Sequence, residues 1–269
     1  MTNTSEFRKL HQAEGCFIIP NPWDVGTARM LESIGFRALA TTSAGMAFSL
    51  GLREGQATRD QVLAHCADIV SATALPVSAD LENGFGHSPE SAAGTIVTVA
   101  AVGLAGGSLE DHTGDPANPI YEFEHAVERI AAAAEARDAL PGDFVLTARC
   151  ENFLWGRADL DDTIRRLQAF EAAGADVLYA PGLRDLTMIA QVCAAVTKPV
   201  NVVMGMPGAV FTVAELAQAG VKRISVGSAL ARLAYGTFVD AARDMHENGR
   251  FDLAGKAMGF AELEGLLPD

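Results

Sequence analysis

The chain has 269 residues, of which 49% are apolar and 20% are charged, so it is long enough to bury a sizeable core. Its formal net charge of −14 repels phosphate backbones, which makes nucleic acid a poor candidate for a partner. No run of about 18 apolar residues marks a membrane span, and the polar N-terminal segment does not resemble a secretory signal.

Strand-like and helix-like segments alternate along the chain. The first predicted strand, residues 17–24, precedes an amphipathic helix that ends at Gly35, a usual C-terminal residue. Two later helices begin at Thr58 and Ser88, which are plausible N-caps. The other predicted strands cover residues 38–46, 76–82, 106–111, 143–151, 175–182, 198–204 and 222–228. The other predicted helices cover residues 122–140, 160–173, 188–196 and 212–220, with a last one from Ala229.

Eight such β/α units predict a (β/α)8 TIM-type barrel, a fold that needs about 250 residues. The strands are short and apolar, as in a parallel sheet that is buried on both faces. A doubly wound open sheet alternates in the same way, but no GxGxxG follows the first strand. Because composition does not change along the chain, we expect residues 1–269 to form one domain.

The positions of the cysteines and lysines indicate the redox compartment and limit the possible catalytic mechanisms. The four cysteines are scattered and form no CxxC pair, which indicates reduced thiols in a cytoplasmic protein. Lys198 and Lys222 precede their strands and so would lie at the end of the barrel opposite the active site. A Schiff-base mechanism needs a lysine inside the pocket and is therefore disfavoured.

Acidic residues gather where two neighbouring strands end, which is where barrel enzymes carry their active sites. Asp80 and Glu82 are two apart, so we expect their side chains to share one face of a strand, and Glu110 follows at the next strand end. Carboxylates without a cysteine or histidine cluster suit a hard cation such as Mg2+, with Mn2+ as an alternative. The competing interpretation for each acid is a helix cap or a loop salt bridge.

Arg149 is the candidate for binding a substrate carboxylate, because its planar guanidinium donates two parallel hydrogen bonds. The alternative is a structural ion pair with Glu151 or Asp176. His112 is a candidate acid or base, although a solvated loop histidine is an equal alternative. Cys150 alternates with Arg149, so we expect it to pack away from the site rather than act as a nucleophile.

Small residues after the second predicted strand form a candidate carboxylate-binding turn, in which backbone N–H groups would face an anion. These residues are Ser43, Ala44 and Gly45, and a plain tight turn is the alternative. Trp23 and Asn201 lie at other strand ends and are further candidates for substrate contact.

Several segments together resemble the isocitrate lyase/phosphoenolpyruvate mutase superfamily, in its phosphoenolpyruvate mutase-like branch, from about residue 7 to 240. In order they are NPWDVGTARMLESIGFRALATTSAG, PVSADLENGFG, SLEDHTGDP, LTARCENFLWG, DLDDTIRRLQAFEAAGADVLYAPGL and RISVGSALAR. The resemblance implies a barrel with Mg2+ at its mouth, positioned partly through waters by residues that match Asp80, Glu82 and Glu110. It also implies that Arg149 and residues 43–45 bind carboxylates. Family members commonly form homotetramers that exchange the last helix between subunits.

The chain also departs from the family pattern. Isocitrate and methylisocitrate lyases carry K-[KR]-C-G-H after the fourth strand, whereas residues 110–121 read EDHTGDPANPIY and lack both the lysine and the general-acid cysteine. Many members of the mutase-like branch carry Pro-Asp-Gly after the second strand, where this chain has Arg53, Glu54 and Gly55. Glu54 therefore takes the place of the aspartate in the gating loop.

The leading functional expectation is a lyase that forms a pyruvate-type enolate from a small 2-oxo acid or a related carboxylate, with Arg149, Glu54 and His112 as catalytic residues. Decarboxylation of oxaloacetate suits a site without the lyase cysteine, because CO2 leaves uncharged. An aldol-type carbon–carbon cleavage is the next expectation. The alternatives are a P–C bond enzyme, such as a phosphonopyruvate hydrolase or a mutase, and a non-catalytic barrel that only binds carboxylates.

Overall fold

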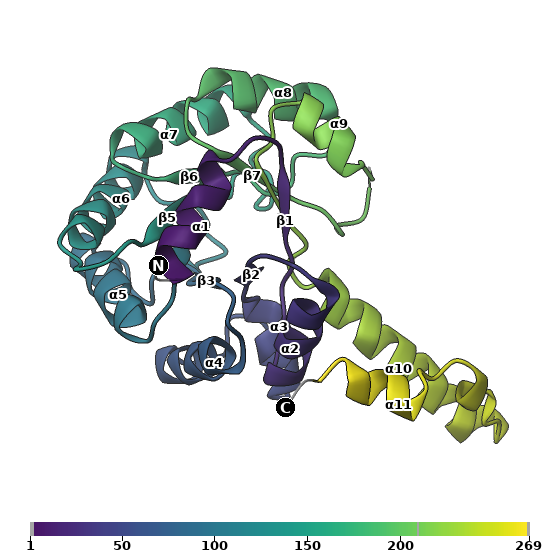
Figure 1. Cartoon of the computed structure of the whole chain (residues 1–269). Coiled ribbons are helices and arrows are strands. Elements are labelled where there is room, and N and C mark those ends of the chain that lie inside the picture. Colours follow the sequence, from purple (N-terminus) through teal and green to yellow (C-terminus); the bar gives the residue numbers. More distant parts are fainter. Residues whose placement is uncertain (1–2, 209, 268–269) are drawn as a thin grey trace.

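Eight parallel strands form a nearly closed barrel in the computed structural model, which describes residues 3–208 and 210–267 (Figure 1). The strands pair in the order β1-β8-β7-β6-β5-β4-β3-β2, and the Ala40 N–H donates to the Pro20 carbonyl at 3.0 Å between β1 and β2. The strands are β1 (Phe17–Ile19), β2 (Leu39–Ala40), β3 (Val77–Asp80), β4 (Gly106–Glu110), β5 (Val145–Arg149), β6 (Val177–Tyr179), β7 (Val200–Val203) and β8 (Arg223–Ser225). The predicted (β/α)8 TIM-type fold is confirmed.

Helices follow the strands and cover the outside of the barrel (Figure 1). Thr58 and Ser88 are the N-caps of α4 and α5, as the sequence predicts. Gly35 ends α2, also as predicted, with a φ of 101°. These helices are α2 (Val25–Ile34), α4 (Arg59–Ala72), α5 (Pro89–Ala101), α6 (Phe123–Asp138), α7 (Leu160–Ala172), α8 (Leu186–Ala195), α9 (Val213–Gln218) and α10 (Ala229–Asn248). No helix in the described ranges is long and apolar enough to cross a membrane.

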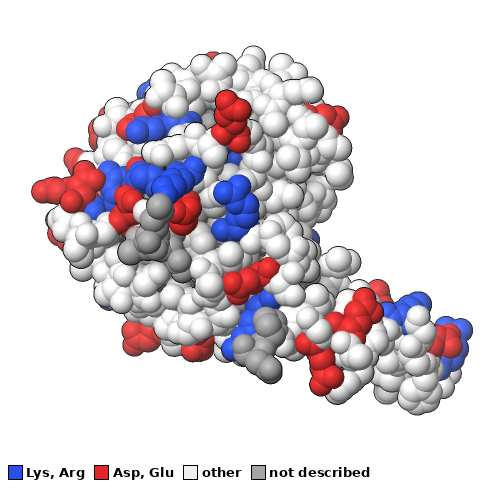
Figure 2. Space-filling view, viewed as in Figure 1, with Lys and Arg blue, Asp and Glu red and all other residues white. Residues whose placement is uncertain are grey.

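Four further helical segments were not predicted. They are α1 (Asn3–Gln12), α3 (Ser43–Ser49), the 3-10 helix η1 (Asp252–Gly255) and α11 (Phe260–Gly265). Helix α1 lies across the end of the barrel where the strands begin, and its fully buried Phe7 packs with Ile19 and Val145 (Figure 1). Helices α10 and α11 project away from the barrel as an arm (Figures 1 and 2).

The strands are shorter than predicted, and the differences fall at the site. The first strand ends at Ile19 rather than at residue 24, because Pro20 and Pro22 have no N–H to donate to a sheet. The second ends at Ala40, since Thr42 caps α3 by accepting a hydrogen bond from the Gly45 N–H. The plain tight turn that was the alternative at residues 43–45 is therefore wrong, because these residues form the first turn of a helix.

Candidate active site

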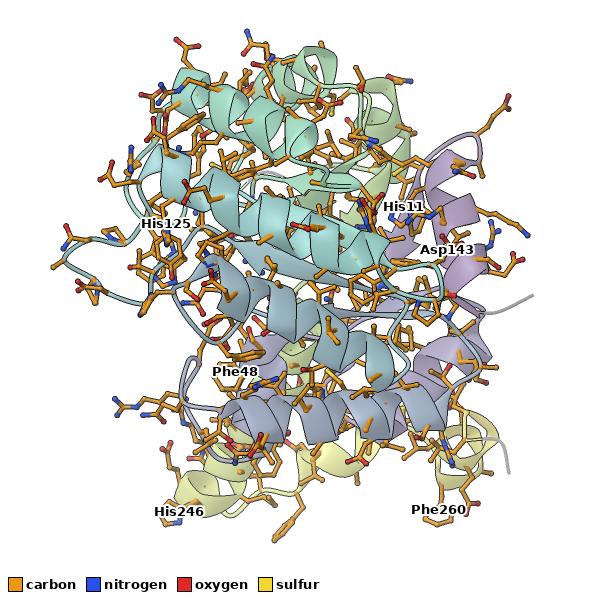
Figure 3. The ribbon with its side chains drawn as sticks, turned by 90° about the vertical axis from the view of Figure 1, so that its left-hand side faces the viewer. His11, Phe48, His125, Asp143, His246 and Phe260 are labelled. Carbon is orange, nitrogen blue, oxygen red and sulfur yellow. The ribbon has the colours of Figure 1, made fainter. Side chains whose placement is uncertain are left out.

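A cavity of about 420 Å3 opens where the strands end, at the end of the barrel opposite α1. Figure 3 shows this arrangement, because Phe48, which lines the cavity, and His11 of α1 lie at opposite ends of the barrel. Ser43, Glu54, Asp80 and Arg149 also line it. The structure thus places four of the predicted site residues around one space.

Arg149, the last residue of β5, is the centre of the charged part of the site. Its Nη1 lies 2.8 Å from Asp80 Oδ1, and its Nη2 lies 3.1 Å from Glu110 Oε2. Nη2 and Nε also contact Glu151 Oε1, at 2.9 and 3.0 Å. The guanidinium lies over the Tyr179 ring, 5.1 Å from its centroid. Four groups fix the orientation of this side chain, and one of them is the Glu151 partner that the sequence left as an alternative.

Asp80, the last residue of β3, uses both carboxylate oxygens. Oδ1 accepts from Arg149, while Oδ2 accepts from the Ser43 hydroxyl at 2.9 Å and from the Ser43 N–H at 3.4 Å. The Asp80 N–H donates to Thr41 Oγ1 at 3.0 Å, which ties the end of β3 to the segment after β2. The first turn of α3 therefore does present an N–H group to an anion, and in this structure that anion is Asp80.

Glu82 and Glu110 lie behind Asp80 and are not among the described residues that line the cavity. The prediction that Asp80 and Glu82 share one face of a strand is wrong, because β3 ends at Asp80 and Glu82 has a φ of 48°. That left-handed conformation turns the chain away from the strand direction and is strained for a residue with a Cβ atom. Glu110 ends β4 as predicted.

Negative charge exceeds positive charge at the cavity mouth. Burial raises the pKa of Glu82 to about 7, and the charges of Asp80, Glu110 and Glu54 add to this effect. The pKa of Glu54 is raised by burial and then by Asp80 and Glu110. The cation that contacts Asp80 and Glu110 is Arg149, whose one charge does not balance all of these carboxylates, so this part of the site would accept a further cation.

Glu151 and Arg149 form the most deeply buried pair of the site. Burial, with smaller contributions from Glu110 and Asp111, raises the pKa of Glu151 to about 8 against the opposing effect of Arg149. Burial opposes the charged form of Arg149, but Glu151, Glu110 and Asp80 together hold its pKa well above the usual value. Arg149 therefore stays charged.

The chemistry of the donor set fits Mg2+, although no ligand cage is preformed. Across residues 3–208 and 210–267, no three histidine, cysteine, aspartate or glutamate side chains converge closely enough to hold a metal. Mg2+ in proteins usually takes one or two carboxylates and completes its shell with water and substrate oxygens. Asp80 at the cavity wall, with Glu82 and Glu110 behind it, provides that kind of site.

His112 lies beside the carboxylates but outside the cavity lining. Its ring stacks on Trp155 at 3.9 Å, and its Nδ1 is 3.6 Å from Glu110 Oε1. Its Nε2 is buried and has no hydrogen-bond partner in the part of the chain that the structure describes. This geometry places His112 directly beside Glu110, slightly beyond hydrogen-bond distance, and leaves its Nε2 as a candidate for proton transfer.

Some of the remaining residues that were predicted to contact the substrate line the cavity, and others pack around it. Ala44 lines the cavity, whereas Gly45 and Trp23 are not among the described lining residues. A Cβ atom at Gly45 would lie 2.9 Å from Trp23 Cβ, so these two residues pack the base of α3. Asn201 lines the inner end, where its Nδ2 donates to Ser225 Oγ at 3.0 Å.

Three residues of the site were not among the predicted functional residues. Glu151 ends the predicted strand 143–151, but β5 ends at Arg149, so the ion pair of Glu151 depends on the loop that follows β5. Tyr179 ends β6 in register with Arg149, which the sixth predicted strand could have indicated. Arg223 begins β8 and also lines the cavity, although strand starts normally lie at the opposite end of the barrel from the site.

Comparison with known proteins agrees with this architecture. A sequence model of the family described as phosphoenolpyruvate phosphomutase matches residues 7–246. The 2-methylisocitrate lyase of Escherichia coli is 33% identical over 204 residues, which are 72% of this chain and 68% of that protein. The oxaloacetate decarboxylase of Ectopseudomonas mendocina is 28% identical over 206 residues, 74% and 69% of the two chains. A crystal structure from Burkholderia cenocepacia, provisionally described as a lyase/mutase, is 56% identical with a TM-score of 0.95 and covers 97% of this chain and 94% of its own.

Proposed function

Because the chain belongs to the phosphoenolpyruvate phosphomutase family, within the isocitrate lyase/phosphoenolpyruvate mutase superfamily, we propose that it is a metal-dependent carbon–carbon lyase acting on a small 2-oxo acid or a related carboxylate. The observation that carries the proposal is the arrangement of Asp80, Glu110 and Glu151 around Arg149 at one cavity. The names of the two curated relatives, a lyase and a decarboxylase, support carbon–carbon cleavage.

We propose Mg2+ as the cofactor, with Mn2+ as the alternative. Asp80 is the residue that would hold the ion from the cavity wall, and Glu82 and Glu110 would act on it through water. When bound, the ion would stabilise the negative charge that moves onto the 2-oxo oxygen as the bond breaks. The excess of carboxylates over cations at the mouth is the electrostatic reason for expecting it there.

Arg149 and the first turn of α3 would bind the substrate. Arg149 donates from a side chain that Glu151 and Tyr179 hold in place, so it meets a carboxylate with little loss of conformational freedom. Ser43 would turn its hydroxyl and N–H from Asp80 to the substrate. The loop that carries Glu54 lines the cavity and would exclude water when it closes.

Proton transfer separates the two candidate reactions. In oxaloacetate decarboxylation the C3–C4 bond breaks, CO2 leaves uncharged, and the enolate then takes a proton at C3, so the leaving group needs no acid. In an aldol-type cleavage a base must take the proton of the hydroxyl group on the carbon that becomes a carbonyl. Glu54 at the cavity and His112 beside Glu110 are the groups placed to take it.

The test is pyruvate release from a panel of acids, with Mg2+ and with EDTA. The panel contains oxaloacetate, malates that carry alkyl substituents, 2-methylisocitrate and phosphonopyruvate. Metal-dependent pyruvate from oxaloacetate, a substituted malate or 2-methylisocitrate supports the lyase. Turnover of phosphonopyruvate alone would favour the P–C bond enzyme, and binding without turnover would favour the non-catalytic barrel.

A further inference from the structure

The inner end of the cavity is polar, although TIM barrels usually fill this space with valine, isoleucine and leucine. Buried hydroxyl and amide side chains from β3, β4, β7 and β8 line it, namely Ser78, Ser108, Asn201 and Ser225. Arg223 of β8 joins them and is only 5% exposed. A cation therefore lies deep in the barrel at the floor of a space that opens to the mouth.

The described partners of Arg223 are all neutral. Its Nε donates to Asn201 Oδ1 at 2.8 Å, and its Nη2 donates to Thr147 Oγ1 at 3.0 Å. Its Nη1 lies 3.2 Å from His11 Nε2, while His11 Nδ1 lies 2.8 Å from the Phe7 carbonyl. Because a carbonyl can only accept, Nδ1 carries the His11 proton and Nε2 accepts from Arg223. A guanidinium has five N–H groups, so two remain beyond these three contacts.

Two other buried arginines show what is different about Arg223. Arg166 is equally buried, but it contacts the carboxylates of Asp111 and Asp162 at 3.2 and 3.0 Å. Arg129 donates to backbone carbonyls such as Gly86 O, and the pocket beside it has no room for a water-sized molecule. Arg223 combines a charge without a carboxylate partner, among the described residues, with open space beside it.

Cations act on His11, the neighbour of Arg223. The charges that lower the pKa of His11 are those of Arg223, Lys222 and Arg8, of which Arg8 is itself paired with Asp143 and Asp176. A buried charge without a counter-ion is costly, and a small anion that accepts the remaining N–H groups would offset that cost.

We propose that Arg223 forms a second anion-binding site at the inner end of the cavity, separate from Arg149, and that it binds one small monoanionic group, either a carboxylate or a halide. The cavity of about 420 Å3 has room for such a group beside a ligand at the mouth, since a water molecule takes about 30 Å3. The nearby hydroxyl groups of Ser78, Ser108 and Ser225 supply further donors. The group can come from solution as a free ion, or it can be the far carboxylate of a bound dicarboxylic acid.

The direct test is a crystal of the wild-type protein soaked in sodium bromide, with anomalous data collected at the bromine edge. The proposal expects a peak within hydrogen-bond distance of the Arg223 guanidinium and none at Arg129 or Arg166. In solution, bromide and formate at constant ionic strength should raise the melting temperature of the wild type more than that of Arg223→Gln. No peak at Arg223, or equal stabilisation of both proteins, would overturn the proposal.

If Arg223→Gln does not fold, the bromide soak of the wild-type protein still tests the proposal, because it needs no variant. Soaking crystals in succinate together with bromide then identifies the source of the anion. Mutually exclusive binding of succinate and bromide identifies the far carboxylate of a dicarboxylic acid, and simultaneous binding identifies a free ion.

Discussion

Arg149 and Asp80 form a 2.8 Å ion pair across the mouth of the barrel, although 69 positions separate them in the chain. The pair joins the ends of β5 and β3, and the two side chains are only 13% and 19% exposed. Each residue also has a partner that fixes it, Glu151 for Arg149 and Ser43 for Asp80. The site is therefore organised before a ligand arrives, which is how an enzyme limits the entropy lost on binding.

Replacing Arg149 with lysine tests the role of the guanidinium. The lysine ammonium keeps the positive charge, but it lacks the planar guanidinium that can bind several carboxylates and a substrate at the same time. We expect kcat/KM to fall by about 100-fold, with a smaller change in stability. Arg165→Lys, at an exposed arginine of α7, is the matched control and should keep wild-type turnover. Equal activity of the two variants would remove Arg149 from the proposed mechanism.

Replacing Gly45 with alanine tests the packing beneath α3. A Cβ atom there would lie 2.6 Å from Thr42 Cγ2 and 2.9 Å from Trp23 Cβ, so alanine must displace the helix that carries Ser43. We expect Gly45→Ala to lower the free energy of unfolding by about 1–3 kcal/mol. Gly236→Ala in α10 meets nothing within 4 Å and should instead be neutral or stabilising. Urea unfolding measures both, and a Gly45→Ala protein as stable as the wild type contradicts the packing.

His11 should make stability depend on pH. Burial, together with the nearby charges of Arg223, Lys222 and Arg8, lowers its pKa to about 3. Between pH 6.5 and about 3 the unfolded chain binds a proton that the folded chain does not, so the stability contributed by His11 is lost as the pH falls. The slope for a single group is at most about 1.4 kcal/mol per pH unit.

The measurement is urea unfolding of the wild type and His11→Gln at pH 7.5 and pH 5.5. Glutamine can still donate to the Phe7 carbonyl and accept from Arg223, but it does not titrate. We expect the variant to lose less stability than the wild type over this interval. An identical loss in both proteins would mean that His11 does not titrate in this way.

The arm of α10 and α11 exposes large apolar side chains that a monomer would leave in water. Leu233 and Phe238 of α10 are 67% and 68% exposed, and Phe260 of α11 is 80% exposed. We expect the chain to form a homo-oligomer through this arm, with the tetramer implied by the family resemblance as the expected size. Light scattering should show a lower mass for Phe238→Asp than for Glu247→Asp, which keeps the charge of an exposed residue of the same helix. A monomeric wild type would contradict this expectation.

The architecture was predictable because its signals are local. N-cap residues such as Thr58 and Ser88 and the C-terminal Gly35 mark helix ends in the sequence, and the alternation of elements then implies the barrel. The ends of the predicted strands indicated Asp80, Glu110 and Arg149, the family segments matched them, and the structure brings them together.

The parts that were missed depend on the path of the chain at the ends of the strands. The partner that Arg149 takes is decided by the path of the chain after β5, which brings Glu151 back to the guanidinium. The end of β3 at Asp80 and the positive φ of Glu82 have no sequence pattern, so Glu82 was wrongly placed within the strand. The buried Arg223 lies at a strand start, where a polar interior was not expected.

The most direct test of the proposed metal-dependent lyase is pyruvate formation during a Mg2+ titration of the wild type, Asp80→Asn and the control Asp143→Asn, whose carboxylate pairs with Arg8 at the other end of the barrel. We use the acid of the panel that gives the fastest turnover. The account predicts saturable activation of the wild type and of Asp143→Asn, no activity in EDTA, and a loss of about 100-fold or more in Asp80→Asn. Metal-independent turnover, or full activity of Asp80→Asn, would contradict it.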